Sequence, residues 1–177
     1  LRASVRFPLE WLREAAYPVR LDPETFYGRV SDGYIRGEDA STYASARGTA
    51  DSRDVTGTTF NVGQTADFYV DRGFLEFDTS GLADKATITR VRLLLTPQAD
   101  NSTTDLTVRV HLLDWASPID DNNMESNFDD ALASEYDADW RGSSGISADT
   151  GYYSSDLDTD YVSTTGFTRY ALLSEED

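Results

Sequence analysis

Apolar and polar side chains alternate most regularly between Leu106 and Leu112. Every second position in this segment is apolar, and the polar positions between them include His111. A two-residue period places one set of side chains in a protein core and the other in water. The segment is therefore predicted to be a half-buried strand, with His111 on its solvated face. Its apolar face consists of Leu106, Val108, Val110 and Leu112.

Weaker versions of this alternation recur along the chain. The segment Ile88–Thr96 carries Val91, Leu93 and Leu95 on one face. Ile88 is out of register, which indicates a bulge or a turn leading into the strand. Further strands are expected at Phe26–Ile35, Thr58–Val62, Phe68–Asp78 and Phe167–Leu173. Short strands separated by turns predict an all-β fold, an antiparallel β-sandwich of the jelly-roll type.

One or two short helices are also expected. Pro8–Ala15 begins with proline, which suits the first turn of a helix, and carries an acidic residue early. In Asp129–Asp139, the side chains of Leu132 and Tyr136 continue a four-residue spacing that begins at Phe128. Both segments are too short to be stable alone, so they must pack against the sheet.

The chain is strongly acidic, with 32 acidic and 15 basic residues and a net charge of −17. Thirteen acids and a single base, Arg141, fall between Asp114 and Asp160. That stretch also holds clusters of Ser, Gly and Asn, which are typical of loops. We therefore expect a long acidic loop region there. A surface this negative repels phosphate backbones, so nucleic acid is not an expected partner.

Composition sets further limits. The chain has no cysteine, which excludes disulfides and cysteine-containing zinc sites. No apolar run approaches the length needed to span a bilayer, so membrane insertion is not expected. Many Asp with almost no Lys is typical of salt-loving hosts, and a GC-rich coding sequence produces the same preference for Arg. Both explanations stay open.

The segment 62–95 resembles the DNRLRE-type domain, a group related to the family-96 carbohydrate-binding modules. Its central phrase is Arg72–Leu82 (RGFLEFDTSGL), followed by Ala86–Thr89 (ATIT) and a strand that opens at Val91. Val108–Trp115 is similar to the next strand of these domains, which commonly ends in Trp, and Thr164–Tyr170 to a later one. The resemblance covers residues 30–174 and implies a β-sandwich more directly than any activity.

Domains of this kind occur in secreted and surface proteins of bacteria and archaea, in polysaccharide-handling enzymes as non-catalytic parts, and in phage structural proteins. In surface proteins a phrase similar to Tyr17–Pro23 (YPVRLDP) often precedes them. We therefore interpret residues 1–25 as an N-terminal extension or linker and residues 26–177 as the sandwich module.

Members of this group usually continue beyond the segment that matches Thr168–Asp177. The resemblance therefore implies a sandwich that lacks its last strand or strands. An unfilled place in a sheet leaves an exposed edge, which a longer parent chain or a donated strand would cover. Leu1–Phe7 has a short alternating pattern and is a candidate donor strand.

Two oxygen-rich clusters are candidate calcium sites. Asp156, Asp158 and Asp160 have the opening spacing of an EF-hand loop, but Tyr161 and Phe167 stand where that loop requires glycine and a bidentate acid. The alternative is an exposed acidic loop. We expect no required cofactor, with calcium as the one candidate ion. The second cluster consists of Asp120, Asp121, Asn123 and Asp129.

Four aromatic residues lie in or beside the acidic region and are candidate ligand-binding residues. Aromatic rings next to carboxylates and amides are typical of sugar-binding surfaces. The alternative is structural: Trp115 would cap the core under a long loop, and Trp140 would anchor the short helix. The four candidates are Trp115, Trp140, Tyr152 and Tyr153.

Catalytic groups have little support in the sequence. The only histidine, His111, is expected on the outward face of a strand without catalytic partners. Arg141–Gly145 (RGSSG) lacks the spacing of a nucleophile elbow. We therefore expect a protein that is not an enzyme.

The preferred hypothesis is a structural module of an extracellular, cell-surface or virion assembly, such as a decoration, tail or filament subunit. Its partners would be copies of itself or other subunits. A carbohydrate-binding or adhesion module of a larger secreted protein is the main alternative, with surface glycans as partners. A passive spacer in a large surface protein is the third.

Overall fold

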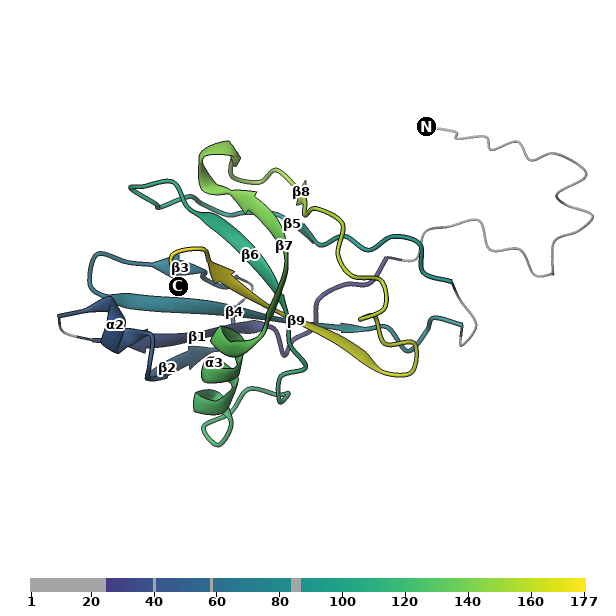
Figure 1. Ribbon diagram of the computed structural model, residues 1–177, viewed down its shortest axis with the longest axis horizontal. Helices are drawn as coiled ribbons and strands as arrows, with labels where there is room; N and C mark the ends of the chain where they lie inside the picture. Colours follow the sequence, from purple (N-terminus) through teal and green to yellow (C-terminus); the bar gives the residue numbers. More distant parts are fainter. Residues whose placement is uncertain (1–24, 40, 58, 84–86) are drawn as a thin grey trace, which may run out of the picture.

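The computed structural model describes residues 25–39, 41–57, 59–83 and 87–177. This part of the chain is mostly antiparallel β-sheet with two short helices, which confirms the predicted all-β class (Figure 1). The helices are α2 (Tyr43–Ala46) and α3 (Met124–Ala133). The strands are β1 (Gly33–Glu38), β2 (Ser52–Asp54), β3 (Gly63–Gln64), β4 (Tyr69–Asp78), β5 (Leu94–Leu95), β6 (Thr107–Leu112), β7 (Glu135–Gly142), β8 (Tyr152–Tyr153) and β9 (Phe167–Ser174).

Seven strands form the main sheet, in the order β2-β1-β4-β9-β6-β7 with β3 paired to β4. Strands β5 and β8 form a separate two-stranded sheet. Strand β9 pairs with β4 on one side and β6 on the other, as in the pairs Leu75↔Tyr170 and Val110↔Leu172. Both neighbours of β9 therefore come from this chain, and within the described residues the main sheet ends at β2 and β7.

Each face of the main sheet is covered by a different layer. The side chains of β4 alternate, so that Phe74 points to the helices and Leu75 to the small sheet. Figure 1 shows α3 below β4 and β9, and β5 and β8 above them. The helix-side core contains Ile35, Val70, Phe74, Trp115, Phe128, Ala131 and Leu173. The β8-side core contains Leu75, Leu93, Val110, Trp140, Leu157, Tyr170 and Leu172.

A fully buried arginine joins the helices to the main sheet. Arg72, on β4, forms a two-pronged ion pair with Asp177 in which the Nε–Oδ2 distance is 2.6 Å. Its Nη1 donates to the carbonyl oxygen of Phe128 on α3, and its guanidinium lies 3.7 Å from the centre of the Phe128 ring. Such a pair holds its partners in one geometry, because a buried guanidinium must satisfy its N–H groups.

The predicted helix at Asp129–Asp139 is wrong in its bounds. Helix α3 begins at Met124 and buries Asn127, Phe128 and Ala131. It ends at Ala133 because Ser134 is extended and its hydroxyl donates to the carbonyl oxygen of Ala131. The following residues form β7, which pairs with β6 in the main sheet.

The other strand predictions vary in accuracy. Those at Leu106–Leu112, Phe68–Asp78 and Phe167–Leu173 are confirmed as β6, β4 and β9. Ile88–Thr96 contributes only the two residues of β5, and Phe26–Ile35 overlaps only the start of β1. No strand lies in the described part of Thr58–Val62. The strand β2 and the helix α2 were not expected.

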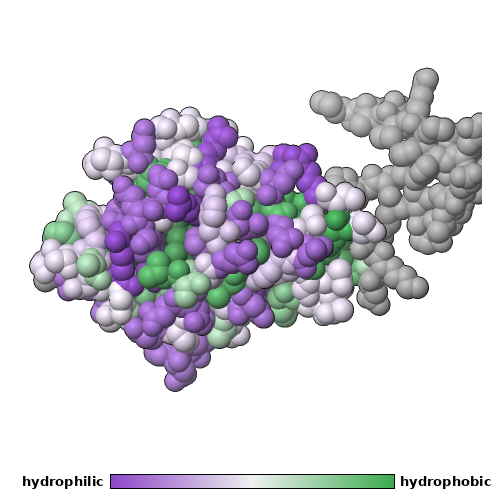
Figure 2. Space-filling view, in the orientation of Figure 1, coloured by the Kyte–Doolittle hydropathy of each residue, from purple (hydrophilic) through white to green (hydrophobic). Residues whose placement is uncertain are grey.

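Several expectations concern residues outside the described part of the chain. These are the donor strand at Leu1–Phe7, the helix at Pro8–Ala15 and the phrase Tyr17–Pro23. Among the helices that are described, none has the length and hydrophobicity of a bilayer-spanning segment. Figure 2 shows hydrophilic residues over most of the visible face, with smaller hydrophobic patches between them.

Candidate binding surface

Trp115 lies apart from the other three candidate aromatics. Its side chain is buried in the helix-side core, where its ring meets Phe74 edge-on at 5.7 Å. The other three belong to β7 and β8, on the opposite face of the main sheet. The structure therefore supports the alternative that Trp115 caps the core.

Trp140 is also buried, but it does not anchor a helix. It lies on β7 and packs in the β8-side core. Its indole N–H donates to the carbonyl oxygen of Tyr152 at 3.1 Å, and the two rings meet edge-on. Trp140 therefore supports β8 from beneath and has no free ring face for a ligand.

Tyr153 is the exposed member of the set. Strand β8 pairs with β5, which places Tyr153 opposite Leu94. These two side chains point away from the core, with 51% and 49% of their surface exposed. Their neighbours Tyr152 and Leu95 point inward and pack on the β8-side core. The alternation of β8 thus produces a small apolar patch on the outer face of the module.

Two arginines lie on the tyrosine rings of β8. The guanidinium of Arg92 lies over the ring of Tyr153 at 4.3 Å, and that of Arg141 lies over the ring of Tyr152 at 4.5 Å. Every other arginine in the described residues has a carboxylate within 4.0 Å, whereas Arg92 and Arg141 have none there. Among the described residues, Arg92 and Arg141 are thus the arginines that contact a tyrosine ring without a carboxylate partner.

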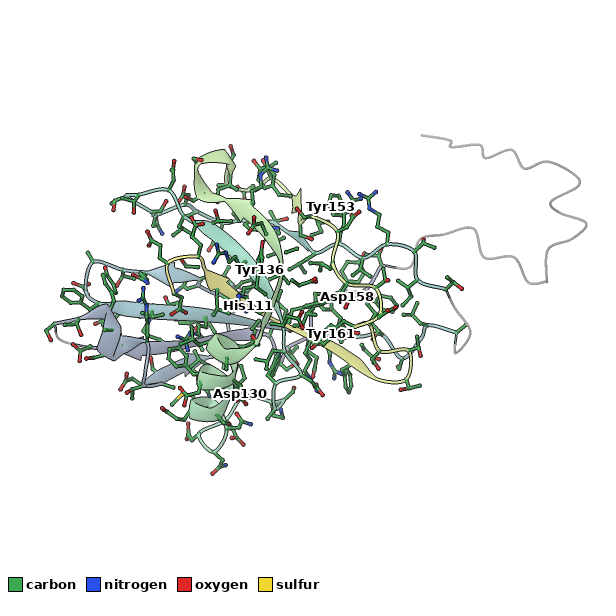
Figure 3. The ribbon with its side chains drawn as sticks, viewed as in Figure 1. His111, Asp130, Tyr136, Tyr153, Asp158 and Tyr161 are labelled. Carbon is green, nitrogen blue, oxygen red and sulfur yellow. The ribbon has the colours of Figure 1, made fainter. Side chains whose placement is uncertain are left out.

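We call the group formed by Arg92, Leu94, Arg141, Tyr152 and Tyr153 the β8 surface. A guanidinium stacked on a ring has its orientation restricted, while its N–H edges stay free to donate. Those edges suit a carboxylate, and the apolar patch suits an aromatic or aliphatic partner. The arrangement is suited to binding. Figure 3 shows Tyr153 at the outer side of the molecule.

The sequence interpretation missed Arg92, Leu94 and Arg141. A signal for the first two was present, because Val91, Leu93 and Leu95 face the core, which directs Arg92 and Leu94 outward. Nothing in the local pattern placed Arg141 beside β8. Its position depends on the packing of β7 against β8.

The candidate calcium cluster of Asp120, Asp121, Asn123 and Asp129 is dispersed in the structure. The carboxylate of Asp120 accepts hydrogen bonds from the backbone N–H groups of Asn122 and Asn123, and these bonds lower the pKa of Asp120. Asp121 pairs with Arg53 beside a shallow groove of about 300 Å³ along β2. Asp129 is exposed on α3. The side chain of Asn123 donates to the carbonyl oxygen of Pro118. These groups shape the turn before α3.

The other candidate calcium cluster, Asp156, Asp158 and Asp160, lies in a loop rather than along a strand. Asp156 pairs with Arg90, with both side chains more than half exposed. The carboxylate of Asp158 accepts the backbone N–H of Asp160, which forms a local turn. Between these acids, Leu157 is buried in the β8-side core. Among the described residues, no three His, Asp or Glu side chains gather closely enough to hold a metal ion.

The expectation that His111 is solvated is wrong. Its side chain does point to the face opposite Val110, as the alternation predicts, but the end of α3 covers that face. His111 is only 9% exposed and lies beside Ser134 and Tyr136. Burial lowers the pKa of His111. The residue packs α3 onto β6 and has no catalytic partner among the described residues.

A group of hydrogen-bonded polar residues surrounds Glu76, on the same side of the main sheet as the helices. Its carboxylate accepts hydrogen bonds from Ser31 at 2.8 Å and Arg169 at 2.6 Å. Burial favours a higher pKa for Glu76, but the hydrogen bonds from Arg169 and Ser31 outweigh burial and lower it. Burial, together with the charge of Glu76, raises the pKa of Asp32 to about 6. Both oxygens of Glu76 are occupied, so the cluster holds the sheet together.

Searches against family models, curated proteins and solved structures find no match to this chain.

Proposed function

We propose that the chain is a non-catalytic structural module of an extracellular, cell-surface or virion assembly. The observation that carries this proposal is the β8 surface. An exposed apolar patch is suited to contact with a partner when the arginines beside it, here Arg92 and Arg141, pair with no carboxylate in the described part of the chain. The resemblance to DNRLRE-type domains, which occur in such assemblies, points in the same direction.

The use of the buried ionisable groups supports a structural role. Arg72 forms an ion pair with Asp177, and the carboxylate of Glu76 accepts hydrogen bonds from Arg169 and Ser31. His111 lies under the end of α3. Each of these groups links two parts of the chain, so together they stiffen the module. A rigid module keeps its contact surfaces in a constant relative orientation.

The β7 edge of the main sheet favours contacts through faces over the addition of strands. Along β7, Glu135 and Asp139 are exposed and acidic, and Asp137 lies between them. The backbone N–H of Ser155 already donates to the carbonyl oxygen of Asp139. Charges along an edge disfavour pairing with another strand. The module is therefore suited to binding partners through surfaces such as that of β8.

Quantitative mass spectrometry of envelope or virion preparations from the encoding organism tests this proposal. We expect the chain in those particles at a fixed ratio to the other structural subunits. Chemical crosslinking of the intact particles should then join residues of the module to neighbouring subunits. If the chain is found only outside such particles, the proposal is contradicted.

Carbohydrate binding is the second candidate function, favoured by the exposed ring of Tyr153 beside the free N–H groups of Arg92. A glycan array tests it with the variant Tyr153→Ala. Selective binding that this variant loses would support the function. Trp140→Ala is unsuitable for this test, because Trp140 is buried and its removal would disturb β8.

A further inference from the structure

A second exposed surface lies on the opposite side of the molecule from β8. Leu132 at the end of α3 and Tyr136 at the start of β7 are 45% and 48% exposed. Asp129 and Asp130 precede them on α3 and are also exposed. We call these four residues the α3 surface. Figure 3 shows Asp130 and Tyr153 on opposite sides of the ribbon.

The acids of the α3 surface stand where the helix itself disfavours them. Asp129 and Asp130 lie in the second half of α3, and no basic residue stands in its last turn. Negative charge near the carboxyl end of a helix interacts unfavourably with the helix dipole. Neither carboxylate has an ion pair among the described residues. A cation from outside would therefore stabilise this end of α3.

The α3 surface and the β8 surface complement each other in charge and in apolar content. One presents Asp129 and Asp130 beside Leu132. The other presents Arg92 on the ring of Tyr153, with Arg141 on the neighbouring ring of Tyr152. Each charged pair lacks a partner of opposite charge among the described residues. Guanidinium and carboxylate groups form two-pronged hydrogen bonds, which hold two surfaces in one orientation.

We propose that the β8 surface of one copy of this chain binds the α3 surface of a second copy. This inference rests on the proposed structural function and names a partner for it. Because the two surfaces lie on opposite sides of the molecule, two copies joined in this way leave one β8 surface and one α3 surface free. Contacts of this kind build rings or filaments.

Ionic strength affects this association in two ways. Two molecules with a charge of −17 repel each other at long range, and salt screens this repulsion. Contacts between adjacent arginine and aspartate groups are less screened because they exclude water. Association should therefore increase as NaCl is raised from about 0.05 M to about 0.3 M.

Sedimentation velocity of the purified full chain tests the proposal at protein concentrations up to about 1 mM. The variants Arg92→Glu and Asp130→Arg should each weaken self-association about tenfold or more. A mixture of the two variants should associate again, because each supplies the surface that the other lacks. Asp67→Arg serves as the control for Asp130→Arg, since it makes the same charge change at an exposed site outside both surfaces.

Three results would overturn the proposal: a wild-type chain that is monomeric throughout this range, single variants that associate as strongly as the wild type, and a mixture that does not recover. Circular dichroism of each variant verifies that it is folded. If the wild type is monomeric and Tyr153→Ala abolishes binding to a glycan, the β8 surface is a sugar site. If native particles contain the chain only in contact with other subunits, the structural function stands and the copy-to-copy contact is contradicted.

Discussion

Gly37 lies where β1 passes closest to α2. A β-carbon at this position would overlap the backbone carbonyl oxygens of Ala46 and Thr49. These oxygens belong to the main chain, which cannot rotate away as a side chain can. The close approach of β1 to α2 thus depends on a residue without a side chain.

Replacement of Gly37 by alanine should lower the free energy of unfolding by about 1–3 kcal/mol, because the backbone of α2 must move to admit the methyl group. Gly81→Ala is the matched control, since nothing lies within 4 Å of the added carbon. Its effect should stay within about 0.5 kcal/mol. Urea denaturation of both variants measures the difference. Equal effects would contradict the assigned contact.

Asp32 is a half-buried acid whose charge the fold disfavours. Burial and the charge of Glu76 raise its pKa from 3.8 to about 6. A raised pKa means that the protonated acid stabilises the folded state. That stabilisation is fully present below pH 3.8 and is lost as the pH rises through about 6.

Asp32→Asn should therefore gain stability relative to the wild type as the pH rises, because asparagine stays neutral. Partial exposure screens the charge, so we expect a gain of about 1–2 kcal/mol between about pH 4 and about pH 7.5. The amide oxygen can still accept the backbone N–H of Glu76. Urea denaturation at both pH values measures the difference. A gain of equal size at both would show that ionisation of Asp32 is not the cause.

At the scale of elements, Arg72 connects parts of the chain that are far apart in sequence. Its guanidinium joins β4 to Asp177 beyond the end of β9 and to the carbonyl oxygen of Phe128 on α3. It also donates to the carbonyl oxygen of Arg47 beside α2. Since the side chain is fully buried, each of these bonds forms away from water.

Arg72→Met should lower the free energy of unfolding by about 3 kcal/mol or more, because the carboxylate of Asp177 would lose its partner in the protein interior. The double variant that adds Asp177→Leu should recover part of this loss. The matched control is Arg90→Met, whose partner Asp156 is exposed. Its cost should stay below about 1 kcal/mol. Thermal and urea unfolding compare these variants and Asp177→Leu alone, and a loss in the double variant equal to the sum of the two single losses would contradict the pairing.

Helix α3 and strand β7 show how one short connection separates two kinds of element. Phe128 and Ala131 face the helix-side core at helical spacing, whereas Ala138 and Trp140 face the β8-side core at the spacing of a strand. Ser134 is the residue at which the chain becomes extended. The change allows β7 to pair with β6 while α3 lies over the opposite face from β8.

The whole molecule carries a charge of −17, much of it in the second half of the chain. Like charges repel more strongly in a folded protein than in an extended chain, so this net charge lowers stability at low ionic strength. Surface ion pairs such as Arg90–Asp156 are too exposed to offset it.

Salt should therefore stabilise the fold. Raising NaCl from about 0.05 M to about 1 M shortens the screening length from about 14 Å to about 3 Å. We expect Tm to rise over this range, as measured by circular dichroism at low protein concentration. Asp67→Arg, which reduces the negative charge, should show a smaller rise. A Tm that is constant or falls with salt would contradict the dominance of charge repulsion.

The sequence predicted those elements whose burial is decided by their own side-chain pattern. Strands β4, β6 and β9 are half buried or central, so their apolar residues alternate or run continuously, and the pattern is readable. The net negative charge and the absence of cysteine also follow directly from the composition. Of the candidate site, Tyr153 and its neighbour Tyr152 were found because aromatic residues beside acidic loops are conspicuous.

Packing between distant segments determined the remainder. His111 has the alternation of a solvated residue, and only the position of α3 buries it. The arginines of the β8 surface acquire their orientation from tyrosines on another strand, and Arg72 finds Asp177 more than one hundred residues away. A local pattern reports whether a side chain prefers water or a core. Which partner it meets depends on how the sheets and helices pack, because contacts across the fold have no period along the chain.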